Sequence, residues 1–216
     1  RTMMSILAEF MRSIGVISII CMGVLCFGVV SAVMVSSPDV VKPGQQVSVF
    51  IGNLDENKPV SILITGNVKT DAGSSFSFGI HDLQLRLDID NPQVHVQMKG
   101  LVPDSTVNLS VNHLEGVEIV YPPERVDANG ACDFTKTEPA LPKGTYFIDI
   151  NGTAARTQIP VSFEVIGING NKETLAESSF NIVGISSGVF HVTTTVSGNV
   201  IEKKQFTVQD QLIALP

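Results

Sequence analysis

Most of the chain alternates apolar and polar residues with a period of two, the pattern of a β-strand with one buried face. The clearest case is 82–89 (DLQLRLDI), where four apolar residues share one face and polar residues the other. Further alternating segments predict strands at 46–51, 59–64, 93–98, 106–111, 144–150, 158–165, 178–183, 189–196 and 200–208. Gly, Pro, Asn and Asp separate these segments at spacings of roughly 8–12 residues, as in a β-sandwich.

The alternation also predicts which side chains are buried. The inward set is Val47, Val49, Val60, Ile62, Ile64, Leu83, Leu85, Leu87, Ile89, Val94, Val96, Met98, Val107, Leu109, Val111, Tyr146, Ile148 and Ile150. The clearest hairpin turn lies at 196–200, because Gly198 and Asn199 both tolerate a positive φ.

A different pattern precedes the strands. Residues 13–38 carry no charge, and 14–35 are almost purely apolar. A bilayer core of about 30 Å requires roughly 20 helical residues, so this run is long enough to span it as a helix. Arg12 on the N-terminal flank agrees with a cytoplasmic start. The run therefore predicts that the rest of the chain lies outside the cytoplasm.

Two interpretations of the run remain open. Val30-Ser31-Ala32 has the small residues of a signal-peptide cleavage site, which would release a chain that starts at Val33. Alternatively, the run stays on the protein and anchors it in the membrane through residues 14–35. The predicted organisation is 1–32 as signal peptide or anchor, 33–154 as one β-sandwich region and 155–210 as a second. A rival boundary near Asn91-Pro92 would give three smaller units.

Composition narrows the function classes. Without Arg1, Arg12 and Glu9, the remaining chain has 12 basic and 20 acidic residues and a net charge of −8. An acidic surface argues against nucleic-acid partners. The absence of Trp and the presence of only 2 Tyr weaken the case for sugar binding through aromatic stacking. Cys132 is the only cysteine after the apolar run, so it has no disulfide partner there and is expected to be buried.

Residues 94–153 contain the most specific motifs of the chain. In order, these are Gly100-Leu101-x-Pro103, the alternating Val107, Leu109 and Val111, a turn from Asp127 to Gly130, and Leu141-Pro142-x-Gly144-Thr145-Tyr146. This stretch resembles the Ig-like β-sandwich repeats of prokaryotic cell-surface and secreted proteins. The resemblance implies an all-β fold of Ig-like antiparallel sandwiches, here preceded by one N-terminal apolar helix. The Leu-x-x-Gly-x-Tyr segment resembles a tyrosine corner, in which the phenol hydroxyl bonds to upstream backbone.

Candidate chemistry is sparse. Asp127, Asn129 and Asp133 offer three oxygen-bearing side chains for Ca²⁺, but the spacing suits a hairpin turn better. Asp88, Asp90 and Asn91 form a second acidic cluster. His81, His95, His113 and His191 show no metal-ligand spacing. Residues 184–188 match G-x-S-x-G, yet a strand follows where a nucleophile elbow needs a helix. No pattern indicates a cofactor, and an enzyme is not expected.

Two glycosylation sequons are present. Asn108-Leu109-Ser110 and Asn151-Gly152-Thr153 both match N-x-S/T. The alternation places Asn108 on the solvent face, since Val107 and Leu109 point inward, and Asn151 ends a predicted strand. Both asparagines are therefore candidate glycosylation sites of an exported protein.

The sequence favours a non-enzymatic cell-envelope or extracellular protein with a structural, adhesive or protein-interaction role. Its expected partners are other envelope or extracellular proteins, including further copies of itself. One alternative is a pilin-like filament subunit with the apolar helix in the filament core, although no prepilin-type processing site is present. Another is a secreted carbohydrate- or ligand-binding accessory domain.

Overall fold

The computed structural model describes residues 33–36, 39–54, 56–86, 88–114, 116, 118–137, 140–170, 173–184 and 187–209. The predicted N-terminal helix and the cleavage site at Ala32 lie outside these residues. The last three residues of the apolar run, 33–35, are described, and they belong to the first strand, Val33–Ser36. Within the described part, no helix is long and apolar enough to cross a membrane.

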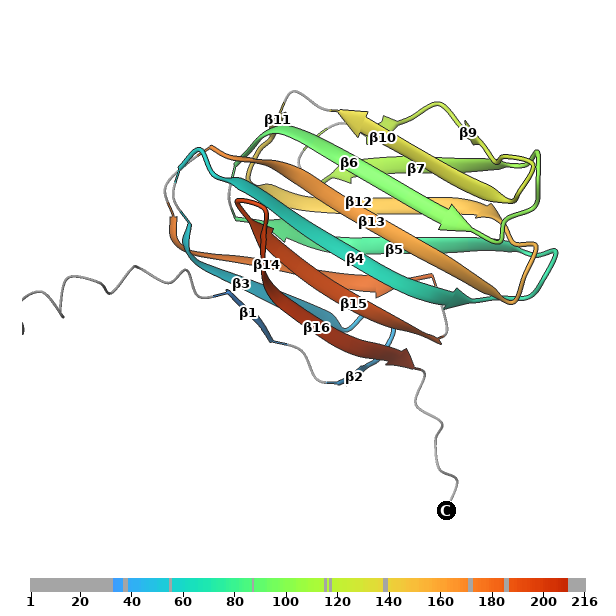
Figure 1. The fold of residues 1–216 in the computed structure, drawn as a ribbon, viewed down its shortest axis with the longest axis horizontal. Coiled ribbons are helices and arrows are strands. Elements are labelled where there is room, and N and C mark those ends of the chain that lie inside the picture. Colours follow the sequence, from blue (N-terminus) through green and yellow to red (C-terminus); the bar gives the residue numbers. More distant parts are fainter. Residues whose placement is uncertain are drawn as a thin grey trace, which may run out of the picture. The chain divides into compact units, whose positions relative to one another are not determined.

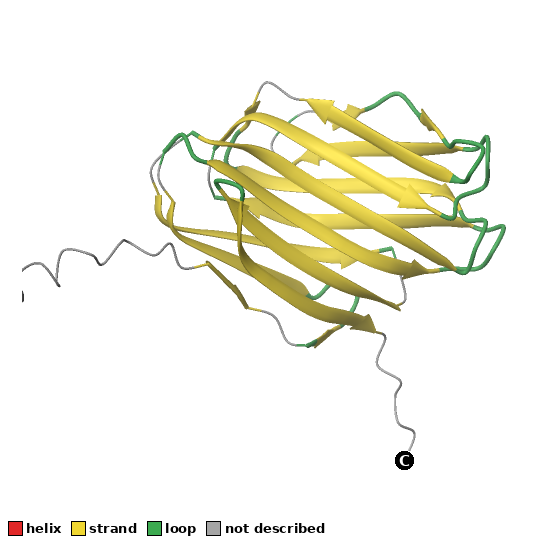
Figure 2. Cartoon of the chain, viewed as in Figure 1, coloured by secondary structure: helices red, strands yellow, loops and turns green. Residues whose placement is uncertain are grey.

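The described residues form two sheets packed face to face, with strands and loops alone (Figures 1 and 2), and every strand pair is antiparallel except the parallel pair of β2 and β16. Sheet A contains β1 (Val33–Ser36), β3 (Gln46–Leu54), β5 (Ser75–Leu85), β7 (Thr106–His113), β8 (Glu118–Val120), β9 (Glu124–Arg125), β12 (Gly144–Thr153) and β14 (Glu173–Val183). Sheet B contains β2 (Val40–Val41), β4 (Pro59–Lys69), β6 (Ile89–Lys99), β10 (Ala131–Thr137), β11 (Ala140–Leu141), β13 (Gln158–Asn169), β15 (Ser187–Val196) and β16 (Asn199–Gln209). The predicted all-β sandwich is confirmed.

The long strands pair in a nested order. β3 pairs with β14, β4 with β13, β5 with β12, and β6 with β10. The order in sheet A is β3-β14-β5-β12, and in sheet B it is β10-β6-β13-β4. Successive long strands therefore alternate between the sheets, as in a long hairpin ribbon rolled up on itself. This is the jelly-roll arrangement, extended by β7 in sheet A and by β15 and β16 in sheet B.

The two sequence regions predicted as separate sandwiches share both sheets. β13, which follows the predicted join at Ala154-Ala155, lies between β6 and β4. β14 likewise lies between β3 and β5. The strand pairing therefore places 33–154 and 155–210 in one sandwich, because each region supplies the neighbours that the other region's strands need.

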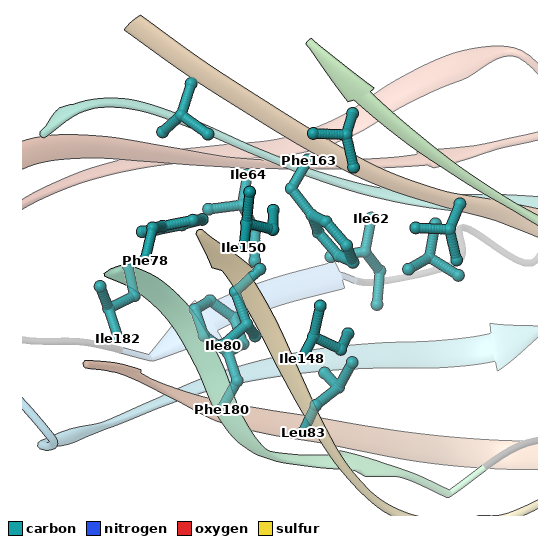
Figure 3. Packing of buried hydrophobic residues seen from close by; sticks show 14 of the residues in the cluster. Ile62, Ile64, Phe78, Ile80, Leu83, Ile148, Ile150, Phe163, Phe180 and Ile182 are labelled. Atoms are coloured by element: carbon teal, nitrogen blue, oxygen red, sulfur yellow. The ribbon is translucent and has the colours of Figure 1, made fainter. Parts of the chain in front are cut away.

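Apolar side chains from both sheets fill the space between them (Figure 3). Phe78 of sheet A stacks on Phe190 of sheet B with ring centroids 5.9 Å apart, and Phe190 stacks in turn on Phe206 at 6.0 Å. Gly66 leaves room for this stack, since a Cβ there would lie 2.2 Å from the Phe190 ring. Every inward residue predicted from the alternation is buried, with Leu87 outside the described residues.

One strand prediction was wrong in detail. The segment 82–89 is divided: β5 ends at Leu85 and β6 begins at Ile89. β5 instead starts at Ser75, and a positive φ at Asp82 marks an irregularity where the register with β12 shifts. Asn91-Pro92, proposed as a rival boundary, lies inside β6, where Asn91 also has a positive φ.

The predicted tyrosine corner is confirmed. Tyr146 is buried at the start of β12, and its hydroxyl donates a hydrogen bond of 2.7 Å to the carbonyl oxygen of Pro142. Burial raises the pKa of the Tyr146 phenol to about 12. The predicted hairpin between β15 and β16 is also present, but its positive-φ residues are Ser197 and Gly198, and Asn199 already pairs with Val196.

Candidate functional site

An open groove runs over the outer face of sheet B and has a volume of about 350 Å³. It crosses four neighbouring strands, β6, β13, β4 and β15, which lie side by side in Figure 1. Its lining side chains include Thr65, Asn67, Gln97, Lys99, Pro160, Ser162, Val189 and His191. The groove thus combines hydroxyl, amide, imidazole and ammonium groups with two small apolar surfaces.

The groove exists because β13 carries compact residues on its outer face. Pro160 and Ser162 occupy the middle of the sheet, and their paired neighbours on β4 are Asn67 and Thr65. On the other side, Ser162 pairs with Gln97 of β6. The short residues Pro160, Ser162, Thr65 and Gly66 thus lie between the longer side chains of β6 and β15, which leaves a trough over β13 and β4.

One wall of the groove is held by a small polar network. Asp133 of β10 accepts hydrogen bonds from Gln97 Nε2 and binds His95 Nε2, both at 2.8 Å. The hydrogen bond to His95 holds the pKa of the Asp133 carboxyl below its usual range. The Gln97 amide is therefore oriented by its nitrogen, while its carbonyl oxygen stays available as an acceptor.

Other polar groups of the groove are unused within the described structure. The side chains of Thr65, Asn67, Ser162 and His191 make no hydrogen bond to any described residue, and all four residues are at least partly exposed. These side chains keep their donors and acceptors for solvent or for a ligand.

One end of the groove carries three cations and lies near the start of β13. Lys99 is exposed, and Lys69 is exposed on the same face of the sheet, opposite Gln158. Arg156 extends its Cδ to 3.5 Å from the position that a Cβ on Gly100 would take. None of the three cations forms an ion pair within the described residues. Asp71 follows Lys69 in the next turn, so the charge at this end is mixed.

The outer face of sheet A is different, because its polar side chains pair with one another. His81 Nε2 lies 2.9 Å from Asp149 Oδ1, above Gly79, where a Cβ would lie within 3.0 Å of both groups. Asn181 donates to Asp82 at 2.7 Å. In addition, Gln46 donates to the Ser179 hydroxyl at 2.8 Å.

The two sequon asparagines meet on this face of sheet A. Asn108 of β7 and Asn151 of β12 are directly opposed in the strand register, and both are exposed. The sequence predicted exposure for both residues but could not predict that they are neighbours, since 43 positions separate them in the chain.

The candidate calcium residues have other roles. The Asp127 carboxylate accepts backbone hydrogen bonds from Asn129 and Ala131, both at 2.8 Å, and the bond from Ala131 is the main cause of its lowered pKa. Asp133 points across to β6, as described above. Among the described residues, no three His, Cys, Asp or Glu side chains lie close enough to share a metal ion.

The remaining candidates are scattered over the fold. Asp88 accepts a hydrogen bond from the Lys143 backbone at 3.0 Å, which ties the turn before β12 to the start of β6. His113 packs against the Tyr146 ring, with centroids 4.8 Å apart. The G-x-S-x-G stretch lies partly outside the described residues, and β15 begins at Ser187 within it. These groups are not brought together at one site.

Cys132 is buried in the core, as predicted from its lack of a partner. Burial, reinforced by Glu124 and Asp133, raises the pKa of its thiol to about 11. The thiol is therefore protonated at neutral pH and shielded from reagents.

Comparisons with known proteins give no family for the chain. No protein-family model matches it, and no curated protein matches it. A solved structure of infectious bursal disease virus, Gx strain, is similar over 83% of this chain and 77% of its own, with a TM-score of 0.24 and 8% sequence identity. A likeness this weak carries no argument about function.

Proposed function

We propose that the protein is an exported, non-enzymatic protein of the cell envelope or cell surface that works by adhesion or binding. In this proposal the apolar run delivers the chain, and the sandwich that follows presents its outer faces to other molecules. Proteins of this class act through surfaces and loops held on a rigid scaffold.

The observation that carries the proposal is where the sandwich begins. β1 starts at Val33, the residue that follows the predicted cleavage site, and it pairs with β3 through four successive positions. The compact unit likewise extends from Ala32 to the end of the chain. Cleavage after Ala32 would therefore leave every strand of the described residues intact, which supports residues 14–32 as a segment that serves delivery alone.

The experiment is to express the full chain and to measure the N-terminus of the exported form by mass spectrometry. A mature chain that begins at Val33 supports release, and an intact apolar run in the membrane fraction supports tethering. Protein found only in the cytoplasm contradicts export. An intact run in an insoluble polymer would favour the filament alternative instead.

The Ig-like assignment is kept only for the local motifs. The tyrosine corner at Tyr146 and the turn from Asp127 to Gly130 support the resemblance. An Ig domain places strands A, B, E and D in one sheet and C, F and G in the other, whereas the nested pairing here has jelly-roll order. We therefore propose a jelly-roll sandwich that carries Ig-like turn motifs.

The carbohydrate-binding alternative gains support from one observation. The groove on sheet B gathers unused hydroxyl and amide groups on an open sheet face, and sheet faces of sandwich proteins present such surfaces to ligands outside the cell.

A further inference from the structure

We propose that the groove on the outer face of sheet B binds a short stretch of a polysaccharide chain. This inference rests on the proposed binding role of the protein and names the ligand class and the site. Four strands, β6, β13, β4 and β15, supply the site.

The hydrogen-bonding groups of the groove match those of a sugar. Each sugar hydroxyl both donates and accepts, and so do the hydroxyls of Thr65 and Ser162 and the amide of Asn67. A site for an anion would instead need donors alone. Because these groups make no hydrogen bond within the described structure, binding a sugar breaks no existing protein contact.

The groove also offers apolar surface between its polar groups. Pro160 of β13 and Val189 of β15, which is 39% exposed, lie on either side of Asn67 of β4 in the strand register. These two side chains can pack against the C–H faces of a sugar ring, the place that an aromatic platform takes in many sugar sites. Aliphatic surfaces contribute less than aromatic ones, so the expected affinity is weak, with a dissociation constant in the millimolar to high micromolar range.

The shape of the groove favours an internal segment of a polymer. Neighbouring strands lie about 4.8 Å apart, so four strands span roughly 14 Å. The volume of about 350 Å³ is near the lower end of the range for small-molecule sites. Since the groove is open to solvent, a chain can enter and leave without a free end.

Gln97 is positioned for this role by its neighbour. Its nitrogen is bound by Asp133, which His95 holds in turn. The bond to Asp133 restrains the Gln97 amide, which lines the groove, and a restrained side chain loses less entropy on binding.

Simple ionic attraction does not explain the site. Lys69, Lys99 and Arg156 lie at one end, but Asp71 is close in sequence to Lys69, and Glu164 lies on β13 beyond Ser162. With charges of both signs around the groove, binding through hydrogen bonds is expected to persist in 0.5 M NaCl, where purely ionic binding is screened.

The test uses the full purified chain in a detergent without a sugar headgroup. The chain is screened on an array of linear neutral and uronate-containing oligosaccharides, and the strongest ligand is titrated in low and high salt. We expect at least one oligosaccharide family to bind, with an affinity that changes less than threefold in 0.5 M NaCl. No binding to any member, or binding abolished by salt, would overturn the proposal.

Variants locate the site. Ser162→Tyr fills the trough and is expected to weaken binding at least tenfold. Ser110→Tyr is the matched control, because Ser110 is also half-buried and lies on the outer face of sheet A. Asn67→Ala, which alters only an exposed side chain, provides a second measurement and is expected to weaken binding at least threefold. Groove variants that bind like the wild type, or an equal loss in Ser110→Tyr, would contradict the site. Because binding is measured on purified protein, the result does not depend on whether the chain is exported.

Discussion

The two outer faces of the sandwich are both polar, yet they use their polar groups differently. On sheet A, His81 pairs with Asp149, and Asn181 donates to Asp82, although the Asn181 Oδ1 has no partner among the described residues. On sheet B, Thr65, Asn67, Ser162 and His191 line a groove with no such partners. A face whose hydrogen bonds are already made is stable against water but has little to offer a ligand. The comparison therefore favours sheet B over sheet A as the location of the proposed binding site.

The largest effect is expected in the core that supports both faces. Phe190 stacks on rings from both sheets and is fully buried, so Phe190→Ala leaves a cavity at the centre of the sandwich. We expect a loss of about 3–5 kcal/mol in the free energy of unfolding, measured by urea denaturation. Val189→Ala, at the adjacent and partly exposed position, serves as control and is expected to change stability by less than about 0.5 kcal/mol. Equal effects would contradict the packing.

The next largest effect is expected at the two opposed sequons on sheet A. Cβ atoms of directly opposed residues lie about 5 Å apart, so glycans on Asn108 and Asn151 would compete for the same space. In a glycosylating secretory host we expect at most one N-glycan per folded chain, measured by intact mass before and after enzymatic glycan removal. Asn108→Gln and Asn151→Gln should each still carry one glycan, and the double variant none. Secreted chains with two glycans would show that the sequons act independently.

A smaller effect is expected at the tyrosine corner of sheet A. Tyr146→Phe removes the hydrogen bond to the Pro142 carbonyl but keeps the buried ring. The expected loss is about 1 kcal/mol in unfolding free energy, measured by urea denaturation. Phe147→Leu, on the opposite face of β12, is a control that leaves this bond in place. No change in Tyr146→Phe would mean that water replaces the bond at no cost.

The smallest effect concerns the wall of the groove on sheet B. The pKa of Asp133 is lowered, chiefly by its hydrogen bond to His95. A carboxyl with a lowered folded-state pKa stabilises the fold above its unfolded pKa, and this contribution disappears as the pH falls through the folded value. The difference in urea midpoint between wild type and Asp133→Asn is therefore expected to be small at pH 6 and to shrink as the pH falls below the usual Asp pKa of about 3.9. A difference that grows toward acid pH would contradict this sign.

The sequence predicted the local structure better than the arrangement of strands. Alternation identified the inward residues because burial on one face is a local pattern. The Leu141–Tyr146 motif likewise predicted a hydrogen bond between residues only four positions apart, Tyr146 and Pro142. Strand order was not predictable in this way. β13 pairs with β4, about 100 positions away in the chain, and nothing in the alternation of either strand specifies that partner.

The groove was missed for the same reason. Its lining comes from four strands spread between Thr65 and His191, so no short motif contains it. One local signal was present: β13 carries Pro160 and Ser162 at successive outward positions, and two compact residues there leave space once longer neighbours flank them. That signal can be used only when the neighbours are known.

The nested strand order also has a consequence for how the chain folds in time. The inner pair, β6 with β10, joins residues 99 and 131, whereas the outer pair, β3 with β14, joins residues 46 and 181. Pairs that close long loops form slowly, because their loop entropy is lost before their contacts are gained. Closure therefore proceeds from the middle of the chain outward, and β3 waits for a strand that is synthesised more than a hundred residues later. During that delay β3 lacks β14, the strand that lies between it and β5 in the finished sheet.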